Sequence, residues 1–475
     1  MQSQPPAARP IHPDGLALAT DLYQLTMGAS YAALGMDRPA VFDLFVRRLP
    51  PSRRFLVVAG LAEALDRLAS LRFEEDDLRY LRTLPIRAEF VDRLVAFRFT
   101  GDVRAVPEGR VVFPDEPILE VEAPLIEAQL AETFVVNAMH HATLVATKAA
   151  RCVEAAGGAL LFDFGLRRTP GIEAGLAVAR AAYLAGFAGT SHVLAGARYG
   201  IPVMGTVAHS FVQACADEVA AFRAFAATFP GPATLLIDTY DTRQGARRAA
   251  AVARELAATG GRLAAVRIDS GDLLADSRAV RAILDEAGLT DVRIVASGGL
   301  DEYEIAALTR AGAPIDSYGV GTRLGTSADA PMLDMAYKLV AYDGTPRLKL
   351  SAGKVTLGGA KQVWRRRDAA GRFVEDRIAA ADEPPPGDDF EPLLERVMAN
   401  GEILVRPGLD EIRARHRAEI AALPERLRAL DDADVRYPVS LSPRLAERQR
   451  AAVAAVRRRE GLDPSGPDPS SGRRA

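Results

Sequence analysis

This chain of 475 residues contains few cysteines, one tryptophan and only a small net charge. Its two cysteines, Cys152 and Cys215, are too few for a disulfide framework and lack zinc-site spacing, so we expect a reducing compartment. The formal net charge of −3 provides no global basic field, which argues against a nucleic-acid partner. The amino-terminal residues show no apolar signal core, and no run of about 18 apolar residues could span a membrane. The sequence therefore predicts a soluble cytoplasmic protein.

Two common phosphate-binding signatures are also missing. The sequence has no G-x-x-x-x-G-K-[ST] run, so a Walker loop is excluded. The pair Gly157-Gly158 precedes a predicted strand instead of following one, so the dinucleotide-binding fingerprint is absent as well. Any phosphate site in this chain must be built in another way.

What the chain does contain is a regular alternation of apolar runs and helical stretches between residues 159 and 322. This pattern is typical of parallel strands covered by helices. A barrel builds its site from several strand ends, whereas an open doubly wound sheet uses one switch point. Because about six strand ends carry polar or glycine clusters, the pattern favours a barrel. The strands are predicted at 159–164, 201–205, 234–237, 263–268, 292–296 and 317–320.

The flanking segments predict further units. Short strands and helices before residue 126 indicate a small α+β domain, and the Arg/Ala-rich stretches near the C-terminus are typical of charged helices. The composition after residue 460 predicts a disordered tail. The expected divisions are an N-terminal α+β domain at 14–125 completed by about 335–370, a barrel at 126–334, a helical C-terminal region at 390–460 and a tail at 461–475.

The stretch from Gly189 to Ala214 holds the strongest candidate site. A turn of small residues, Gly205 to Ala208, is followed by a predicted helix that starts near His209. Small residues let a ligand approach the backbone, and the free N–H groups of a new helix suit an anion. A histidine at that edge can exchange a proton or attack phosphorus. The alternative is a structural histidine in a strand–helix turn.

Charged residues at the ends of two other predicted strands add to this picture. Arg267 and Asp269 are two residues apart, so alternation places both on one face, as a structural ion pair or as part of a site. Asp269 and Asp272 together could hold Mg²⁺, which prefers carboxylates plus substrate phosphates. Arg168, after the first barrel strand, suits a phosphate or a carboxylate because its planar fork binds bidentately.

Glycine-rich ends follow the last two predicted strands, at Ser297-Gly298-Gly299 and at Gly319 to Thr322. Late loops of a barrel commonly form its phosphate site, so Ser297, Gly299, Gly321 and Thr322 are candidate substrate contacts. Together these strand ends indicate a ligand that is a polyphosphate sugar or a nucleotide.

Five short sequence blocks, taken in chain order, resemble those of a known protein family. The chain resembles the nicotinate phosphoribosyltransferases from the first helix through about Trp364. The resemblance implies a type II phosphoribosyltransferase, with an irregular TIM-like α/β barrel and a smaller α/β domain built from the N-terminal part and the post-barrel strands. The blocks are TDLYQLTM (20–27), FDFGLRR (162–168), GTVAHSFV (205–212), VRIDSGDL (266–273) and YGVGT (318–322).

The resemblance also implies an activity. Nicotinate and 5-phosphoribosyl 1-diphosphate would give nicotinate mononucleotide and diphosphate, in a ligase reaction of NAD biosynthesis coupled to ATP hydrolysis, with Mg²⁺ as cofactor. A homodimer with sites near the subunit interface is implied as well. Matched positions assign nicotinate contacts to Tyr23, Thr206 and Arg267, phosphorylation by ATP to His209, the phosphoribosyl moiety to Thr322, and carboxylate or phosphate binding to Arg168.

Two alternatives remain open at this point. One is a relative that uses nicotinamide or another type II phosphoribosyltransferase, for which an amide-selective site would need no cation for a carboxylate. The other is a non-catalytic paralogue that keeps the barrel for binding or regulation. The presence of Tyr23, Thr206, His209, Arg267 and Thr322 argues against the second alternative.

Overall fold

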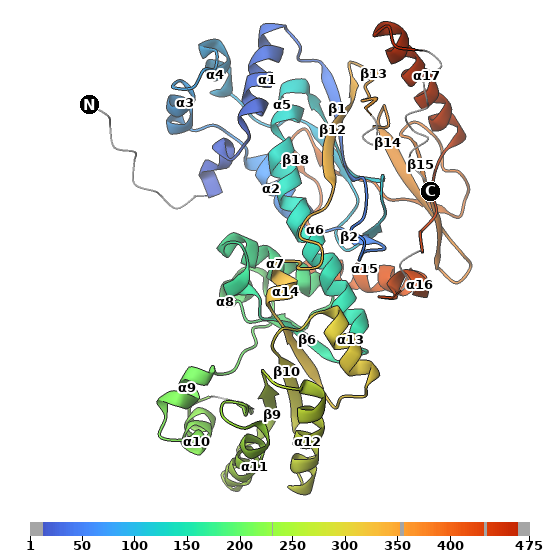
Figure 1. Cartoon of the computed structure of the whole chain (residues 1–475). Helices are drawn as coiled ribbons and strands as arrows, with labels where there is room; N and C mark the ends of the chain where they lie inside the picture. Colours follow the sequence, from blue (N-terminus) through green and yellow to red (C-terminus); the bar gives the residue numbers. More distant parts are fainter. Residues whose placement is uncertain (1–12, 230, 352–355, 432–434, 464–475) are drawn as a thin grey trace.

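The computed structural model describes residues 13–229, 231–351, 356–431 and 435–463. Figure 1 shows an upper part built on antiparallel strands and a lower part built on parallel strands, with the long helix α6 (Glu132–Ala155) running between them. From residue 464 onward the predicted tail at 461–475 lies outside the described residues. No helix in the described ranges combines the length and the apolar character needed to cross a membrane.

The upper part is organised around β1 (Pro39–Val46), seven of whose eight residues are buried. Such an apolar run suits a strand that is covered on both faces. Strand β1 pairs antiparallel with β5 and with β12, so the segment after the parallel strands lies beside the N-terminal one. The sheet has the order β13-β12-β1-β5-β3-β17-β18, with β3 (Asp102–Ala105), β5 (Pro117–Pro124), β12 (Met335–Tyr342), β13 (Thr345–Pro346), β17 (Glu395–Ala399) and β18 (Glu402–Ile403).

Short helices surround this sheet and the small ladder of β2 (Leu56–Val57) with β4 (Val111–Val112). Helix α2 supplies Leu61, Leu65 and Leu68 to the core shared with β1, whereas residues of the other short helices gather in a separate apolar cluster. The helices are η1 (Pro13–Leu18), α1 (Leu22–Ala33), α2 (Leu61–Ser70), α3 (Glu75–Leu81), α4 (Ala88–Leu94) and α5 (Leu125–Leu130).

A separate four-stranded sheet follows β12. It has the order β16-β14-β15-β19, so β14 leaves the sheet that contains β1 and β12. The helical C-terminal region predicted at 390–460 is not confirmed, because β16, β17 and β18 precede its first helix and β19 lies between α16 and α17. These strands have five residues or fewer, too short for a clear alternation of apolar residues in the sequence. The bounds are β14 (Lys361–Arg367), β15 (Phe373–Ala380), β16 (Phe390–Pro392), β19 (Val439–Leu441), α15 (Leu409–Ala422), α16 (Glu425–Arg428) and α17 (Pro443–Arg459).

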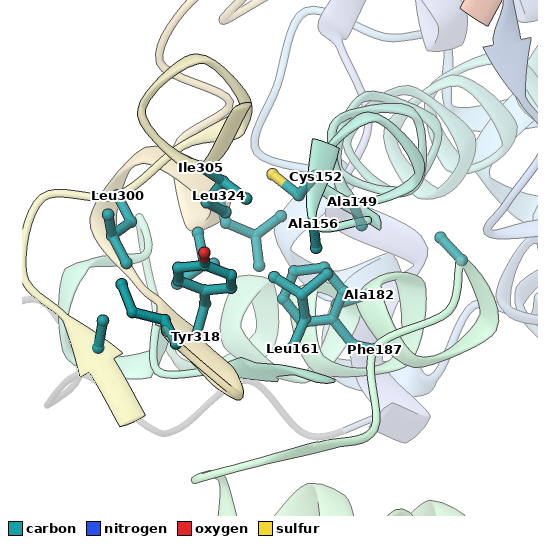
Figure 2. Close-up of a cluster of buried hydrophobic side chains, with 14 of the residues drawn as sticks. Ala149, Cys152, Ala156, Leu161, Ala182, Phe187, Leu300, Ile305, Tyr318 and Leu324 are labelled. Carbon is teal, nitrogen blue, oxygen red and sulfur yellow. The ribbon is translucent and has the colours of Figure 1, made fainter. Parts of the chain in front are cut away.

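The lower part contains a six-stranded parallel sheet in the order β7-β6-β11-β10-β9-β8. Figure 2 shows its core, where Cys152 of α6 and Ala156, the residue after this helix, lie beside Leu161 of the sheet and Leu324. The strands are β6 (Leu160–Asp163), β7 (Gly189–Thr190), β8 (Ala233–Leu236), β9 (Leu263–Ile268), β10 (Arg293–Ser297) and β11 (Ser317–Val320). The helices between them are α7 (Ile172–Leu184), α8 (Val193–Tyr199), α9 (His209–Ala214), α10 (Glu218–Thr228), α11 (Thr242–Ala258), α12 (Leu273–Glu286) and α13 (Glu302–Arg310).

This sheet is a half-barrel, so the prediction of a complete barrel is not confirmed. Among the described strands, no ladder joins β8 back to β7. The strand predicted at 201–205 makes only an isolated bridge between Val203 and Thr190. Its second residue, Pro202, has no N–H to donate, which weakens strand pairing.

The segment 203–209 nevertheless connects the two edges of the half-barrel at its carboxyl end. On one side, the Met204 amide donates to the Thr190 carbonyl at the end of β7, at 2.9 Å. On the other, His209 Nδ1 lies 3.1 Å from Oγ1 of Thr239, which follows β8. The turn that bears the candidate histidine therefore crosses the open gap of the sheet.

Candidate active site

The centre of the site is an ion pair at the end of β9. Nη2 of Arg267 donates to Oδ1 of Asp269 at 2.7 Å, which confirms that the two side chains share a face of the strand. Ser297, the last residue of β10, accepts a hydrogen bond from Arg267 Nε at 2.9 Å and donates one to Asp269 Oδ1 at 2.5 Å. Neighbouring parallel strands thus place three predicted site residues in one hydrogen-bonded group.

Competing effects act on the pKa of the Asp269 carboxyl. Burial raises this pKa, but the hydrogen bond from Ser297 and the positive charge of Arg267 outweigh burial and leave it below its ordinary value. Asp269 is therefore ionised at neutral pH, and its negative charge faces the candidate histidine. His209 Nε2 lies 3.8 Å from Asp269 Oδ2.

The turn at 205–209 supplies two further predicted residues to the same group. Nη1 of Arg267 donates to Oγ1 of Thr206 at 3.1 Å. Nδ1 of His209 pairs with Thr239 Oγ1, which leaves Nε2 on the side of Asp269. Thr206, His209, Arg267, Asp269 and Ser297, which we call the central cluster, come together as the sequence predicted.

The predicted phosphoribosyl residues lie on neighbouring loops. Strands β6 and β11 pair in parallel, so the loops that follow them are adjacent: η2 (Leu166–Arg168) and α14 (Thr322–Gly325). The approach is close, because a Cβ on Gly165 would lie 3.2 Å from the carbonyl oxygen of Gly321. The Arg168 side chain is exposed and pairs with no acidic group in the described ranges. Gly299, Gly321 and Thr322 border this region from the ends of β10 and β11.

The backbone of Gly298 packs closely against the carbonyl group of Asp269, a residue of the central cluster. Its φ of +98° lies in the left-handed region, and a Cβ there would meet the Asp269 carbonyl oxygen at 2.0 Å. We expect Gly298→Ala to lower the free energy of unfolding by about 2 kcal/mol or more and to reduce activity with it. Thermal melts and steady-state rates measure the two effects.

The matched control is Gly312→Ala, at a φ of +65° with open space around the added methyl group. This variant should lose only about 1 kcal/mol and keep its activity. If both variants lose the same free energy of unfolding, the clash with Asp269 does not contribute to the loss in Gly298→Ala.

Two predicted residues, Tyr23 and Asp272, lie outside both the central cluster and the phosphoribosyl loops. Tyr23 is the second residue of α1, in the upper part of Figure 1, whereas β9 and β10 lie in the lower part. Its hydroxyl accepts a hydrogen bond from Gln24, and burial together with Glu132 raises its pKa to about 12. Asp272 is the N-cap of α12, where Oδ1 accepts from the Ala275 amide at 3.0 Å.

Two functional candidates were missed in the sequence. Asp238, two residues after the end of β8, accepts hydrogen bonds at Oδ2 from the Asp269 amide (2.9 Å) and from Ser270 Oγ (2.6 Å). Its Oδ1 is buried and has no partner among the described residues. A signal was present, because Ile237-Asp238-Thr239 repeats the pattern of Ile268-Asp269-Ser270 at the next strand.

The second is Phe164, whose ring centroid lies 5.6 Å from the Arg267 guanidinium carbon. A Cβ on Gly319 would come within 2.4 Å of this ring, so glycine at that position makes room for it. In the sequence, Phe164 is indistinguishable from an apolar core residue at a strand end.

Two carboxylates at the candidate site, Asp269 and Asp272, could hold a metal ion. Nowhere in the described part of the chain do three His, Cys, Asp or Glu side chains gather closely enough to hold a metal ion. Asp269 and Asp272 each use Oδ1 in hydrogen bonds to protein groups. Their Oδ2 atoms remain available as oxygen ligands for a metal ion. Two such ligands fit a cation such as Mg²⁺, which keeps waters and takes most of its other ligands from a substrate diphosphate.

Comparison with known proteins places this geometry in a family. Three family models match the chain: the nicotinate phosphoribosyltransferase N-terminal domain over residues 18–140, the nicotinate phosphoribosyltransferase family over 159–348 and the nicotinate phosphoribosyltransferase C-terminal domain over 387–449. The nicotinate phosphoribosyltransferase pncB2 of Mycobacterium tuberculosis is 52% identical over 434 residues, covering 90% of this chain and 92% of the relative. The human nicotinate phosphoribosyltransferase is 35% identical over 523 residues, covering 92% and 96%.

Solved structures agree. The crystal structure of human nicotinic acid phosphoribosyltransferase matches with a TM-score of 0.82 and 32% identity, covering 91% of this chain and 99% of that one. A nicotinate-nucleotide pyrophosphorylase from Pyrococcus furiosus matches with a TM-score of 0.70 and 26% identity, covering 89% and 99%. From the family models and from a 52% identical relative matched over nearly its whole length, the chain belongs to the nicotinate phosphoribosyltransferase family.

Proposed function

We propose that this chain converts nicotinate and 5-phosphoribosyl 1-diphosphate to nicotinate mononucleotide and diphosphate, a cytoplasmic step of NAD biosynthesis coupled to ATP hydrolysis. The observation that carries the proposal is the central cluster. It joins a cation, a hydroxyl group, an ionised carboxylate and a histidine at the carboxyl end of the parallel sheet of a family member. That edge is where α/β sheets of this kind bind their ligands.

Arg267 is the proposed partner of the nicotinate carboxylate. Its guanidinium is mostly buried, with 12% of the side chain exposed, so an anion placed there is shielded from water. Thr206 lies at hydrogen-bond distance from the same group, and the Phe164 ring next to it offers an apolar face for the pyridine ring. A neutral amide would leave this cation without a second anion.

The loops after β10, β11 and β6 are the proposed site for the phosphoribosyl diphosphate. Thr322 and the amides near Gly321 suit the phosphate, and Arg168 adds an exposed cation on the adjacent loop. Ser297 and Gly299 border the space between these loops and Arg267. In the proposed arrangement, the anomeric carbon of the sugar would lie between the base and the diphosphate.

The reaction needs positioning more than covalent chemistry. Departure of diphosphate gives the sugar oxocarbenium character, which fixed charges stabilise without reorganising. The pyridine nitrogen forms the new bond to carbon as the bond to the diphosphate oxygen breaks. Asp269 and Asp272 would hold Mg²⁺, which when bound would offset the charge of the leaving diphosphate.

His209 is the proposed link to ATP. When Nδ1–H donates to Thr239, the lone pair of Nε2 is free to attack the γ-phosphorus, and the bond to the ADP oxygen breaks. The phosphoryl group on Nε2 would add negative charge beside Asp269, and such a change biases loop conformations.

A homodimer is part of the proposal. Tyr23 lies outside the central cluster of its own chain, on a helix of the upper part. A second copy would have to bring Tyr23 to the nicotinate site, which supports an arrangement with the site near a subunit interface.

The test is a comparison of nicotinate with nicotinamide. We expect kcat/KM to favour the acid by about a thousandfold, because the acid alone brings a second carboxylate, beside that of Asp269, to the mostly buried Arg267. Arg267→Gln should remove most of this preference by lowering the value for nicotinate. The control Arg281→Gln changes an arginine of α12 that pairs with Asp285 and should leave the preference intact.

Other outcomes separate the alternatives. Equal constants for acid and amide would refute carboxylate recognition by Arg267, and a preference for the amide would favour a nicotinamide-using enzyme. Turnover of neither base, with nucleotide binding retained, would favour a non-catalytic paralogue.

A further inference from the structure

Five charged side chains form a buried group between the upper and lower parts, and the reaction described above uses none of them. We call it the buried charge cluster: Arg53, Lys148, Arg151, Glu302 and Asp329. Side-chain exposure is 0% for Arg53, Lys148 and Glu302, 2% for Arg151 and 16% for Asp329. The residues come from the loop before β2, from α6, from α13 and from the segment after α14.

The contacts within this cluster are short. Lys148 Nζ lies 2.5 Å from Glu302 Oε2 and 2.6 Å from Asp329 Oδ1. Arg53 Nη2 donates to Asp329 Oδ1 at 3.0 Å. Arg151 Nε donates to Glu302 Oε1 at 3.1 Å. Asp329 therefore pairs with two of the three cations, and Glu302 pairs with all three, because Arg53 Nη1 lies 3.5 Å from Glu302 Oε1.

The charges in this group do not balance. Three cations face two carboxylates, so a positive charge is left over, and Arg53 Nε and Nη1 have no hydrogen-bond partner among the described residues. Burial opposes ionisation of Asp329, but Arg53 and Lys148 lower its pKa to about 2. A buried excess charge is costly, so a purely structural ion-pair group would be expected to avoid it.

The cluster is attached to the loop that carries Thr322. Arg53 Nη2 donates to Ser327 Oγ at 3.2 Å, and that hydroxyl donates to the Ala330 carbonyl at 2.8 Å. Ser327 has a φ of +44°, a left-handed conformation that a serine adopts only when its surroundings hold it. The segment 321–327, which we call the phosphate loop, thus ends at a residue held by Arg53.

The neighbouring loop is attached as well. Glu302 begins α13, a few residues after Ser297 and Gly299. The residue before it, Asp301, caps α13 and accepts a hydrogen bond from Arg323 of the phosphate loop at 2.8 Å. Figure 2 shows Leu324 and Ile305 packed together near Cys152 of α6, the helix that bears Lys148 and Arg151. Both loops therefore share one buried support.

We propose that Arg53 is a positioning residue for the phosphoribosyl diphosphate site: through Ser327 and Asp329 it holds the phosphate loop in its binding shape, and the excess positive charge of the cluster favours the anion bound there. The proposal rests on the proposed function, since that function places the diphosphate sugar at Thr322. It gives the N-terminal part of the chain a role in binding this substrate.

The experiment measures binding and turnover in Arg53→Met, Arg53→Lys and Ser327→Gly. Arg53→Met should raise KM for 5-phosphoribosyl 1-diphosphate about tenfold, with kcat and KM for nicotinate within about twofold, because a shifted loop weakens binding of that substrate alone. Arg53→Lys keeps the charge and should recover most of the loss. Ser327→Gly relieves the left-handed strain and removes the hydroxyl, so it should fold and still raise this KM about threefold.

The matched control is Arg365→Met. Arg365 is also fully buried and paired with two carboxylates, Asp376 and Glu419, but it lies in the four-stranded sheet. It should melt at a lower temperature with an unchanged KM. A parental KM in both Ser327→Gly and Arg53→Met, or the same rise in Arg365→Met, would overturn the proposal.

Calorimetric titration of each variant with 5-phosphoribosyl 1-diphosphate and Mg²⁺, without nicotinate, separates this inference from the proposed function. The parent should bind, and Arg53→Met should bind about tenfold more weakly. A parent that binds but transfers to no pyridine base refutes the proposed function alone. Equal affinity of parent and variant refutes the positioning role alone.

Discussion

Asp269→Asn is expected to lower kcat/KM for nicotinate about a thousandfold, because the variant removes the negative charge that contacts Arg267, Ser297 and His209. An asparagine oxygen can still accept hydrogen bonds, so the cluster should keep its shape. What it loses is the anion that balances Arg267 and offers an oxygen to Mg²⁺. Steady-state rates over a range of Mg²⁺ concentrations measure the loss.

The stability of Asp269→Asn relative to the parent is expected to depend on pH. Since the pKa of Asp269 is lowered in the folded state, its ionised form stabilises the fold above the pKa of the unfolded chain, and this contribution disappears as the pH falls through the lower, folded value. Asp269→Asn should therefore melt slightly below the parent at neutral pH, with a difference that shrinks on acidification. Full activity of the variant at low Mg²⁺ would refute the assignment.

Asp272→Asn is the natural companion. Asparagine is as good an N-cap as aspartate, so the start of α12 should persist. Any activity lost in this variant then reports on Mg²⁺ and should be restored by a higher Mg²⁺ concentration.

His209→Asn is expected to abolish stimulation by ATP while the protein folds and keeps some transfer at high 5-phosphoribosyl 1-diphosphate. Diphosphate is already a leaving group, so ATP must act through the protein, and Nε2 of the partly exposed His209, 3.8 Å from Asp269, is the nucleophile that we assign. Incubation with γ-labelled ATP and peptide mapping should find an acid-labile, base-stable label on His209 in the parent and none in the variant.

Thr239→Val refines this test. The change removes the hydroxyl that orients Nδ1 and should slow labelling about tenfold without removing it. Label on a different residue, or ATP stimulation that survives in His209→Asn, would reject the mechanism.

Sequence periodicity predicted the parallel sheet well where its strands are buried on both faces. The bounds of β9 and β11 agree with the expected 263–268 and 317–320, because apolar runs of this kind end sharply at polar residues. The same reasoning failed at 201–205, where apolar composition suggested a strand but Pro202 and solvent exposure leave only one bridge. The barrel therefore stays open.

The residues of the central cluster could be predicted from the sequence, because strand alternation and the positions of strand ends determine where their side chains lie. Arg267 and Asp269 follow from a spacing of two residues, and Thr206 and His209 from one turn. Phe164 was missed because its contact with Arg267 joins residues far apart in the sequence, whereas Asp238 was missed although its strand end repeats the pattern of Ile268 to Ser270. The family resemblance assigned Tyr23 to the nicotinate site although the predicted domain bounds placed it in the N-terminal part, and α1 lies in the upper part of Figure 1.

The most direct test of the account is product formation by the purified protein with nicotinate, 5-phosphoribosyl 1-diphosphate and Mg²⁺, with and without ATP. We expect nicotinate mononucleotide and diphosphate in equal amounts, formed slowly without ATP and faster with it, and little nucleotide when nicotinamide replaces nicotinate. No nucleotide from nicotinate under either condition, or nucleotide from nicotinamide alone, would contradict the account.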